Sequence, residues 1–284
     1  MLQIVIPAYN EERRLPRTLR ELRRHVVTHR GALGRVEVIV VDNASTDATA
    51  EVAREVDSPV MPVRVVRCTR RGKGAAVRAG LLATDADLVC FMDADGATGL
   101  DALQDAWRLA QQGADVVIGS RAVAGSLTEA RHCRTRSAGA TFYRRVAGRL
   151  TPGIADTQCG FKVFRGDIVR AVVVDLRACG FSFDVELLVR LRAAGARIEE
   201  MPVSWVDVPG STFVPARHGA SAFLELARIA WRARELSRPA AARTVVGARS
   251  PMPMPVPAAL TAGLAAAVFP MVADGGDLRG GTAP

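Results

Sequence analysis

The chain has 284 residues, of which 49% are hydrophobic and 24% are charged. This length allows one substantial core with an appendage, and the composition is typical of an ordinary folded domain. The formal net charge of +9 favours an anionic partner, but charge alone does not distinguish nucleic acid, acidic lipid and phosphorylated substrates. The five cysteines include no C-x-x-C pair, so zinc or dithiol redox chemistry is not indicated and a reducing, cytoplasmic setting is expected.

The first 119 residues alternate between apolar runs of strand length and segments with helical spacing. The opening run reaches a turn at Pro7 and lacks the basic residues that begin a signal peptide, so it predicts a first strand. The alternation predicts a doubly wound α/β sheet with helices on both faces. Strands are predicted at 3–7, 37–42, 64–67, 88–93 and 115–119, and helices at 17–29, 47–56, 73–83 and 100–112.

The pattern is less regular in the second half of the predicted domain. A basic stretch follows residue 119, and regular spacing returns with a strand at 161–164, a helix at 184–194 and a strand at 198–203. We therefore predict one domain over 1–238, divided at residue 120 into two halves that contribute different sides of a site.

The C-terminal part of the sequence contains two further segments. Residues 221–237 predict a basic amphipathic helix, and two interpretations stay open: a helix packed on the domain, or one that lies on a membrane surface. From residue 239 to 284 the composition shifts to Pro, Ala and Gly, which predicts a disordered tail. Prolines interrupt the uncharged stretch at 250–273, so a membrane-spanning helix is not predicted there.

Two acidic residues, Asp93 and Asp95, come directly after the apolar run 88–92. Two like charges at the rim of a buried strand are unfavourable unless a positive charge joins them. Mg²⁺ or Mn²⁺ suits this place, because a hard cation takes oxygen ligands and is often shared between carboxylates and substrate phosphates. Such a triplet is weak evidence alone, since it also caps helices and closes turns, but its place after a predicted strand strengthens the interpretation.

Polar residues follow other predicted strands as well, and ligands bind at the carboxyl ends of strands in such sheets. Tyr9 and Glu11 follow the first strand and Asp42 ends the second, where an aromatic ring and carboxylates suit a base and a ribose. The loop 70–74 holds three cations and two glycines before a predicted helix, which suits the close approach of phosphate. Its spacing is not that of a Walker A loop.

Four of these motifs, taken in order, resemble family 2 glycosyltransferases of the GT-A fold, which implies a Rossmann-like mixed sheet with helices on both faces. Two later segments, 156–164 and 183–188, make the chain similar to the dolichyl-phosphate β-glucosyltransferases and bacterial polyprenyl-phosphate glycosyltransferases, and the resemblance covers roughly residues 1–235. The four motifs are Ile6-Pro7-Ala8-Tyr9-Asn10-Glu11, Val41-Asp42-Asn43-Ala44-Ser45-Thr46-Asp47, Arg71-Gly72-Lys73-Gly74 and Asp93-Ala94-Asp95-Gly96-Ala97-Thr98.

The resemblance implies an inverting enzyme that transfers a hexose, expected to be glucose, from a UDP-sugar to a polyprenyl phosphate. It implies a metal, Mg²⁺ or Mn²⁺, held by Asp95 with Asp93 nearby. Asp156 is the candidate general base for a hydroxyl acceptor, whereas for an ionised phosphate it would only orient the acceptor. Residues expected to bind the nucleotide sugar are Pro7, Ala8, Tyr9, Glu11, Asp42, Lys73, Asp93, Ala94 and Asp95, and candidates for the acceptor phosphate are Arg121, Arg131, Arg134, Arg136 and Arg217.

Two departures from the family pattern leave the acceptor open. Ala97 stands where related mannose enzymes often carry glutamine, so a third protein ligand of the metal is unassigned, and Thr212 stands where the family usually carries lysine. An alternative is therefore a soluble enzyme that acts on a small hydroxyl or amine acceptor. Nucleic acid is not expected as a partner, because no aromatic-plus-basic motif is present. The expected location is the cytoplasm, with peripheral contact at the cytoplasmic face of a membrane as the open question.

Asp184 and Glu186 also leave two interpretations of equal weight. They alternate with apolar neighbours at the start of a predicted helix. Either they bind sugar hydroxyls, or they cap that helix.

Overall fold

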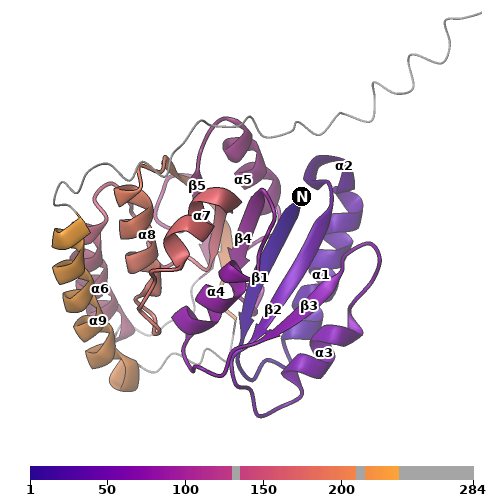
Figure 1. Cartoon of the computed structure of the whole chain (residues 1–284), viewed down its shortest axis with the longest axis horizontal. Coiled ribbons are helices and arrows are strands. Elements are labelled where there is room, and N and C mark those ends of the chain that lie inside the picture. The colour runs from indigo at the N-terminus through magenta and orange to yellow at the C-terminus, as the bar shows by residue number, and fades with distance from the viewer. Residues whose placement is uncertain (130–134, 209–214, 237–284) are drawn as a thin grey trace, which may run out of the picture.

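The computed structural model describes residues 1–129, 135–208 and 215–236, and a seven-stranded sheet organises them (Figure 1). Within helices α6 and α9, side chains are described from residue 143 and from residue 222 to 234. The strands are β1 (Leu2–Ala8), β2 (Val36–Asp42), β3 (Val63–Arg67), β4 (Leu88–Met92), β5 (Val116–Ser120), β6 (Leu127–Glu129), β7 (Phe161–Arg165), β8 (Ile198–Pro202) and β9 (Ser204–Val206). The helices are α1 (Leu15–Thr28), α2 (Arg30–Leu33), α3 (Thr49–Glu55), α4 (Lys73–Leu82), α5 (Ala102–Gln111), α6 (Thr135–Leu150), α7 (Gly166–Val173), α8 (Phe183–Ala193) and α9 (Pro215–Leu236).

The sheet has the strand order β3-β2-β1-β4-β7-β5-β8, and only β7 runs against its neighbours β4 and β5. The sheet is therefore mixed, as the predicted fold class requires. Because β7 is antiparallel, it begins at the edge where the parallel strands end. The loop that precedes β7 therefore lies at that edge. This one reversal brings residues 156–160 beside the loop after β4.

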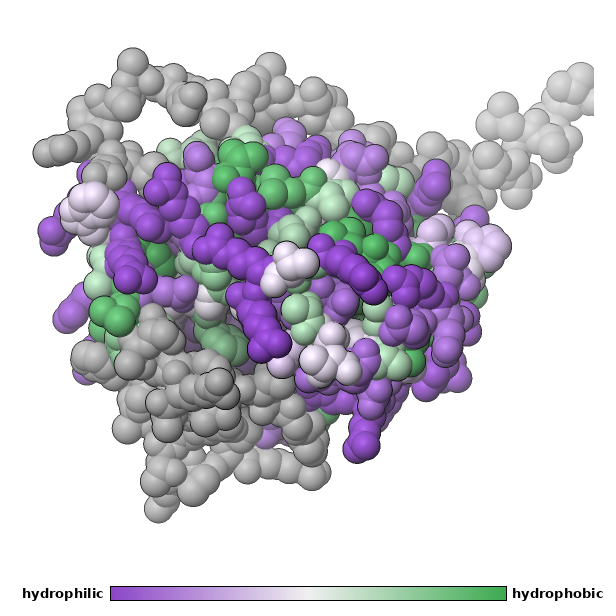
Figure 2. All heavy atoms as spheres, turned by 60° about the horizontal axis from the view of Figure 1, so that its bottom comes forward, coloured by the Kyte–Doolittle hydropathy of each residue, from purple (hydrophilic) through white to green (hydrophobic). Residues whose placement is uncertain are grey.

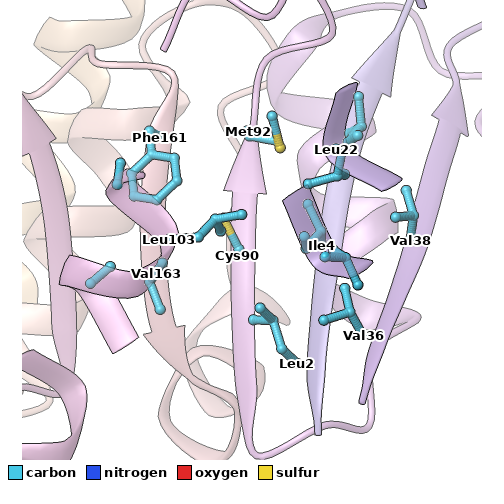
Figure 3. Packing of buried hydrophobic residues seen from close by; sticks show 14 of the residues in the cluster. Leu2, Ile4, Leu22, Val36, Val38, Cys90, Met92, Leu103, Phe161 and Val163 are labelled. Atoms are coloured by element: carbon cyan, nitrogen blue, oxygen red, sulfur yellow. The ribbon is translucent and has the colours of Figure 1, made fainter. Parts of the chain in front are cut away.

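Helices cover both faces of the sheet and enclose two hydrophobic clusters. Leu2, Ile4 and Ile6 of β1 face the cluster under α1, α2, α3 and α5, while Val5 faces the cluster under α4 and α6 to α9 (Figure 3). This alternation follows from the two-residue period of a strand, in which successive side chains point to opposite faces. Both faces are covered because the central strands are apolar at nearly every position, as predicted from the continuous apolar runs.

The region around residue 203 differs from its prediction. A single strand was expected at 198–203, but the chain pairs with β5 as β8 and then leaves the main sheet as β9, which pairs in parallel with β6. The short β6 and the helices α2, α6 and α7 were not among the predicted elements. The pairing partners of β9 lie far away in the sequence, so no local pattern marked the change of sheet.

Helix α9 bears out the packed interpretation of the C-terminal helix on one of its sides. Leu226 and Ile229 are buried against the rest of the domain, whereas Leu224 and Trp231 on the opposite side are 59% and 63% exposed. Among the residues that the structure describes, no helix is both long and apolar enough to cross a bilayer. The predicted tail, 239–284, lies outside the described residues.

Candidate active site

The strands β1, β2 and β4 end at the same edge of the sheet, and the predicted site residues follow them there. This edge is at the bottom of Figure 1, and Figure 2 shows it turned forward, with hydrophilic side chains across the middle of the face. Tyr9 is 37% exposed on this edge, while Ala8 is buried and Pro7 is half-buried beside it. The exposed aromatic ring is thus available to a planar ligand.

The loops after β1 and β2 are locked together by hydrogen bonds between side chains and backbone. Asn10, which has a left-handed backbone with φ 54°, accepts a bond from the backbone N of Thr46 (2.9 Å) and donates its own N–H to Ser45 Oγ (3.1 Å). Asparagine tolerates this backbone conformation better than most residues. The two loops are therefore a single rigid unit.

Glu11 lies buried within the same unit. Its backbone N donates to Thr49 Oγ1 (2.8 Å) and its carboxylate pairs with Arg14. Burial raises the pKa of Glu11 above its ordinary value despite Arg14, and the charges of Asp95 and Asp93 add to that rise. Glu11 is therefore electrostatically part of the acidic site.

Asp42 and Asn43 at the end of β2 position the loops on either side. Asp42 is buried and its Oδ1 accepts the backbone N of Ser45 (3.0 Å). Asn43 Nδ2 donates to the carbonyl of Arg70 (2.7 Å), and its Oδ1 accepts the backbone N of Gly72 (2.8 Å). Asn43 thereby fixes the basic loop, a role that the sequence did not predict although the residue lies within a recognised motif.

Lys73 and Asp93 form an ion pair with Nζ 2.7 Å from Oδ1, and both side chains are partly exposed, at 23% and 32%. Burial disfavours the ammonium, but Asp93 and Asp184 outweigh it and raise the pKa of Lys73. The predicted phosphate-binding lysine and the predicted metal-site aspartate are thus direct partners. The pair provides one cation and one anion at the same point of the site.

Asp95 is half-buried and its Oδ1 accepts the backbone N of Ala97 (3.0 Å). Burial, and then the neighbouring charge of Asp93, raise the pKa of Asp95 above its ordinary value. A carboxylate in this state is stabilised by an added cation. Ala94 between the two is buried, and its carbonyl accepts a bond from Thr18 Oγ1 (2.8 Å).

The described residues contain no group of three or more His, Cys, Asp or Glu side chains placed to hold a metal ion. Two carboxylates suit a hard cation whose other ligands are substrate phosphates and water. The donor set of Asp93 and Asp95 therefore fits Mg²⁺ or Mn²⁺ that is shared with a diphosphate, and does not fit a cation held by protein ligands alone.

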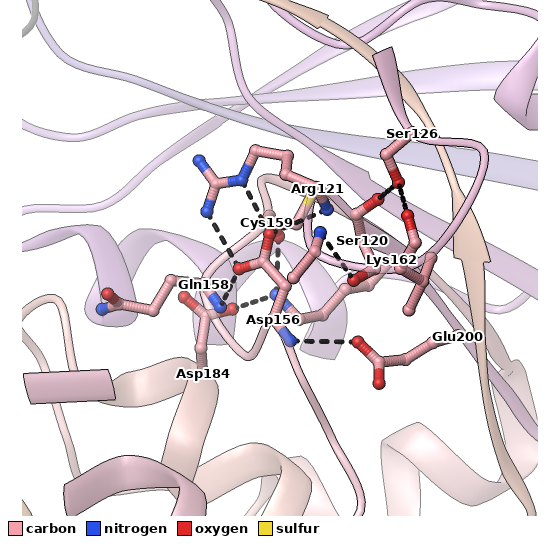
Figure 4. Close-up of polar contacts among 11 residues, drawn as sticks. Ser120, Arg121, Ser126, Asp156, Gln158, Cys159, Lys162, Asp184 and Glu200 are labelled. Carbon is pink, nitrogen blue, oxygen red and sulfur yellow. Dashed lines mark hydrogen bonds and ion pairs between the residues drawn. The ribbon is translucent and has the colours of Figure 1, made fainter. Parts of the chain in front are cut away.

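Asp156 and Arg121 form a two-point ion pair on the other side of the site (Figure 4). Arg121 Nε and Nη2 donate to the two carboxylate oxygens at 2.7 and 2.9 Å, and the backbone N of Arg121 donates to Oδ2 at 3.1 Å. Burial alone would raise the pKa of Asp156, but Arg121 reverses this and lowers it. A carboxylate held in this way is ionised yet weakly basic, which favours the orienting role over that of a general base.

Lys162 and Asp184 form a buried ion pair beneath this loop. Lys162 is fully buried near the start of β7, with Nζ 2.5 Å from Asp184 Oδ1 and 2.7 Å from the carbonyl of Cys159. Burial raises the pKa of Asp184. The pair was not predicted, because neither a lysine within a strand nor its partner 22 residues later has a local signature.

Asp184 and Glu186 do not cap α8, which has no side-chain capping hydrogen bond among the described residues, and each has another partner. Glu186 accepts the backbone N–H groups of Arg177 and Ala178 at 3.0 and 2.6 Å and pairs with Arg190, so it anchors a loop to α8. Asp184 is buried against Lys162. Neither side chain stands free for a sugar hydroxyl.

The loops of Asp93 and Asp156 meet at Gly160. The backbone N of Asp93 donates to the carbonyl of Gly160 (2.9 Å), and a Cβ at position 160 would collide with the carboxylate of Asp93. Glycine is therefore required for this close approach. The contact joins the acidic motif after β4 to the loop that begins β7.

Of the five predicted acceptor arginines, the structure places only the side chain of Arg121. Arg131 and Arg134 lie outside the described residues. Arg136 and Arg217 fall on helices α6 and α9, but their side chains are not among those described. Thr212 and its segment likewise lie outside the described residues.

Comparison with known proteins identifies sequence relatives over most of the chain. The family model described as "Glycosyl transferase family 2" matches residues 3–173. The dolichyl-phosphate β-glucosyltransferase of Homo sapiens is 35% identical over 75% of this chain and 70% of its own length. The enzyme of the same name from Saccharomyces cerevisiae is 33% identical over 74% and 68%.

Comparison of structures finds proteins of similar fold. Glucosyl-3-phosphoglycerate synthase from Mycobacterium tuberculosis, solved with Mn²⁺, UDP and phosphoglyceric acid, superimposes with a TM-score of 0.60 over 85% of this chain and 80% of that one. The sequence identity is 21%, so this likeness concerns the fold. It confirms the doubly wound GT-A fold that the motifs predicted.

Proposed function

The chain belongs to glycosyl transferase family 2, and we propose that it transfers glucose from UDP-glucose to a polyprenyl phosphate with inversion at the anomeric carbon. The proposal is supported by relatives above 30% identity that are named for transfer of glucose to dolichyl phosphate. The alternative, a small hydroxyl or amine acceptor, has no comparable support.

The observation that carries the proposal is the position of Arg121 across from the acidic motif. Arg121 is paired with Asp156, and the loop of Asp156 contacts Asp93 at Gly160, so a fixed cation stands near the carboxylates of the donor side. An acceptor phosphate held by Arg121 would lie beside the bond to be broken. Guanidinium groups bind phosphate well because their planar donors match two of its oxygens.

In the proposed reaction an oxygen of the acceptor phosphate attacks C1 of glucose. The bond from C1 to the β-phosphate oxygen breaks, and its electron pair leaves with UDP. A phosphate monoester is already ionised near neutral pH, so the acceptor requires no general base. Asp156 then holds Arg121 in place and orients the acceptor, in agreement with its lowered pKa.

On the donor side we assign the base and ribose to the loops after β1 and β2, with Pro7, Ala8 and Tyr9 at the base and Glu11 and Asp42 toward the ribose. Lys73 and the backbone at Ala94 are assigned to the diphosphate. Lys73 already faces an anion, Asp93, and a diphosphate arriving there would offer its ammonium a second one.

Asp95, with Asp93 beside it, would hold Mg²⁺ or Mn²⁺ together with the diphosphate. A bound divalent cation supplies positive charge where negative charge develops on the departing UDP. The raised pKa of Asp95 supports this assignment, because a neighbouring cation offsets both the burial and the repulsion from Asp93 that raise it.

We also propose peripheral contact with the cytoplasmic face of a membrane through α9. Leu224 and Trp231 are seven residues apart and so share the exposed face of the helix, with the exposed Arg228 between them. Such a face suits the cytoplasmic leaflet, which carries anionic lipid. Sedimentation with vesicles containing phosphatidylserine should recover the wild type and less of Trp231→Glu. The control Val174→Glu, at an exposed apolar residue that follows α7, should behave as the wild type.

A radiolabelled transfer assay tests the main proposal. Purified protein is incubated with labelled UDP-glucose and Mg²⁺ or Mn²⁺, with and without polyprenyl phosphate, and the mixture is extracted with chloroform. We expect label in the organic phase only when both polyprenyl phosphate and metal are present. Label that stays in the aqueous phase when polyprenyl phosphate is present would contradict the lipid acceptor. Equal transfer in the presence of EDTA would contradict the requirement for a metal.

A further inference from the structure

Strand β9 contacts both sides of the site. Its Ser204 carbonyl accepts the backbone N of Gly99 (2.8 Å), and its Val206 N donates to the carbonyl of Ala97 (2.9 Å). Between these bonds, Trp205 is bridged to Thr98 in antiparallel fashion. The loop that follows Asp95 is therefore paired along its backbone with β9.

The side chain of Trp205 reaches the other side. The guanidinium carbon of Arg121 lies 5.3 Å from the centroid of the Trp205 ring, within the range of a cation–π interaction. One residue of β9 thus joins the acidic loop through its backbone and the acceptor-side arginine through its ring.

The hydrogen bonds to Asp156 determine which donors of Arg121 remain for a ligand. A guanidinium has five N–H bonds, and the hydrogen bonds to the Asp156 carboxylate use Nε and Nη2. Nη1 carries two further N–H bonds in the same plane. The guanidinium carbon lies over the indole ring, and their cation–π attraction opposes displacement of the group.

We propose that Trp205 is a positioning residue for the acceptor phosphate. It holds the guanidinium of Arg121 in the orientation set by Asp156, so that the remaining N–H groups meet the acceptor near the loop of Asp95. The inference rests on the proposed function, since it assigns Arg121 to the acceptor. Trp205 acts through Arg121 and touches neither substrate in this arrangement.

A merely structural role would have different consequences. Trp205 is half-buried and packs on the edge of the cluster under α1 and α5. The bonds of β9 to Ala97 and Gly99 are made by backbone atoms, so they survive a change of side chain. If Trp205 only supported the fold, its replacement would weaken donor and acceptor binding alike.

The test compares Trp205→Leu, Trp205→Phe and the control Trp107→Leu in detergent micelles. Trp107 packs against the same hydrophobic cluster, so the control removes an equal ring from the same core. Trp205→Leu should raise the acceptor KM about 3- to 30-fold, which corresponds to the usual range of a cation–π contact, and leave the donor KM within about twofold. Trp205→Phe should lie between wild type and Trp205→Leu, and Trp107→Leu should change neither KM.

A second measurement does not depend on the acceptor. The Nε–H signal of Arg121 is assigned in an NMR spectrum by its loss in Arg121→Lys, and it should carry a ring-current shift that disappears in Trp205→Leu. Titration with inorganic phosphate should move this signal in the wild type and move it less in Trp205→Leu.

The outcomes separate the two proposals. A wild type without transfer to polyprenyl phosphate would overturn the proposed function, and the NMR signal and its phosphate titration would still decide the inference. Equal changes in donor and acceptor KM, or an Arg121 signal that is the same in Trp205→Leu, would overturn the role of Trp205.

Discussion

The two sides of the site are held in place by different means. On the donor side, the bonds of Asn10 join the loops after β1 and β2, and those of Asn43 join the loops after β2 and β3. On the acceptor side, the side chain of Arg121 is held, among the described residues, by one carboxylate and one ring. Single changes should therefore affect acceptor binding more selectively than donor binding.

Asp95→Asn should cause the largest loss of transfer activity, through the donor side of the site. It removes the carboxylate charge assigned to the metal but keeps an oxygen for the backbone N of Ala97, so the fold is retained. We expect transfer to fall roughly 1,000-fold or more, since a metal contributes several kcal/mol to stabilising a departing diphosphate. The radiolabelled assay measures this loss. The control Asp105→Asn, on the exposed side of α5, should keep wild-type activity, and a fully active Asp95→Asn would remove the metal argument.

Arg121→Gln should break the acceptor side alone. We expect the acceptor KM to rise about 10- to 100-fold, because a charge-assisted contact to phosphate contributes about 1.5–3 kcal/mol. The donor KM should stay close to that of the wild type. Steady-state kinetics with each substrate varied in turn would show the split, and a parallel rise in both constants would contradict the division of the site.

The same substitution should also lower stability, because it leaves the buried Asp156 without its cation. Adding Asp156→Asn should restore much of the free energy of unfolding but none of the acceptor affinity. Urea denaturation of the single and double variants separates these effects. A double variant as unstable as Arg121→Gln would show that the pair does not act as a unit.

Asn43→Ala should have a smaller effect, limited to the donor side. It removes the bonds that hold the carbonyl of Arg70 and the N–H of Gly72, and so loosens the loop that carries Lys73. We expect the dissociation constant of UDP to rise about 5- to 10-fold, the equivalent of one or two net hydrogen bonds. Asn43→Asp should recover only the bond from Gly72. Calorimetric titration with UDP provides the measurement, and unchanged UDP affinity in Asn43→Ala would contradict the role of this residue.

The pH dependence of substrate binding should also differ between the two sides, by a smaller amount than the substitutions above. The pKa of Asp95 and that of Glu11 are raised, whereas that of Asp156 is lowered. As pH falls, the donor-side carboxylates should take up protons first, so UDP and metal affinity should decline while Asp156 stays ionised. The donor KM measured against pH would test this order, because the acceptor phosphate itself takes up a proton at about pH 6. A donor KM that stays constant down to the ordinary pKa of an aspartate would contradict it.

The raised pKa of Asp95 also has a consequence for stability. The folded state binds this proton more tightly than the unfolded chain does, so Asp95 costs stability as pH rises from its unfolded pKa through its folded pKa. Above that window the cost is complete. In the absence of metal near neutral pH, Asp95→Asn should therefore raise Tm by about 1–3 °C, a fraction of a kcal/mol for a domain of this size. A Tm that falls would contradict the raised pKa.

Much of the fold could be predicted because its signals are local. The apolar runs of β1, β2 and β4 and the helical spacing between them depend on neighbours within a few residues. The place of Asp93 and Asp95 followed from the same pattern, since residues directly after a strand lie at its carboxyl end. The donor side was therefore largely visible in the sequence.

The acceptor side depended on pairings across long stretches of chain. Arg121 and Asp156 meet over 35 residues, and Lys162 and Asp184 meet because β7 is inserted between β4 and β5. Trp205 reaches Arg121 only because β9 leaves the main sheet. No spacing within one sequence encodes these contacts, because each is set by which strands lie side by side.

By itself, the sequence determined the alternation of strands and helices, the family motifs and the acidic pair after β4, because short-range periodicity and strand ends specify them. Only the tertiary structure decided that Asp156 is bound by Arg121, that Asp93 is bound by Lys73 and that β9 joins the two sides. The physical reason is that a charge takes its partner, and its pKa, from whatever the fold places within a few ångströms.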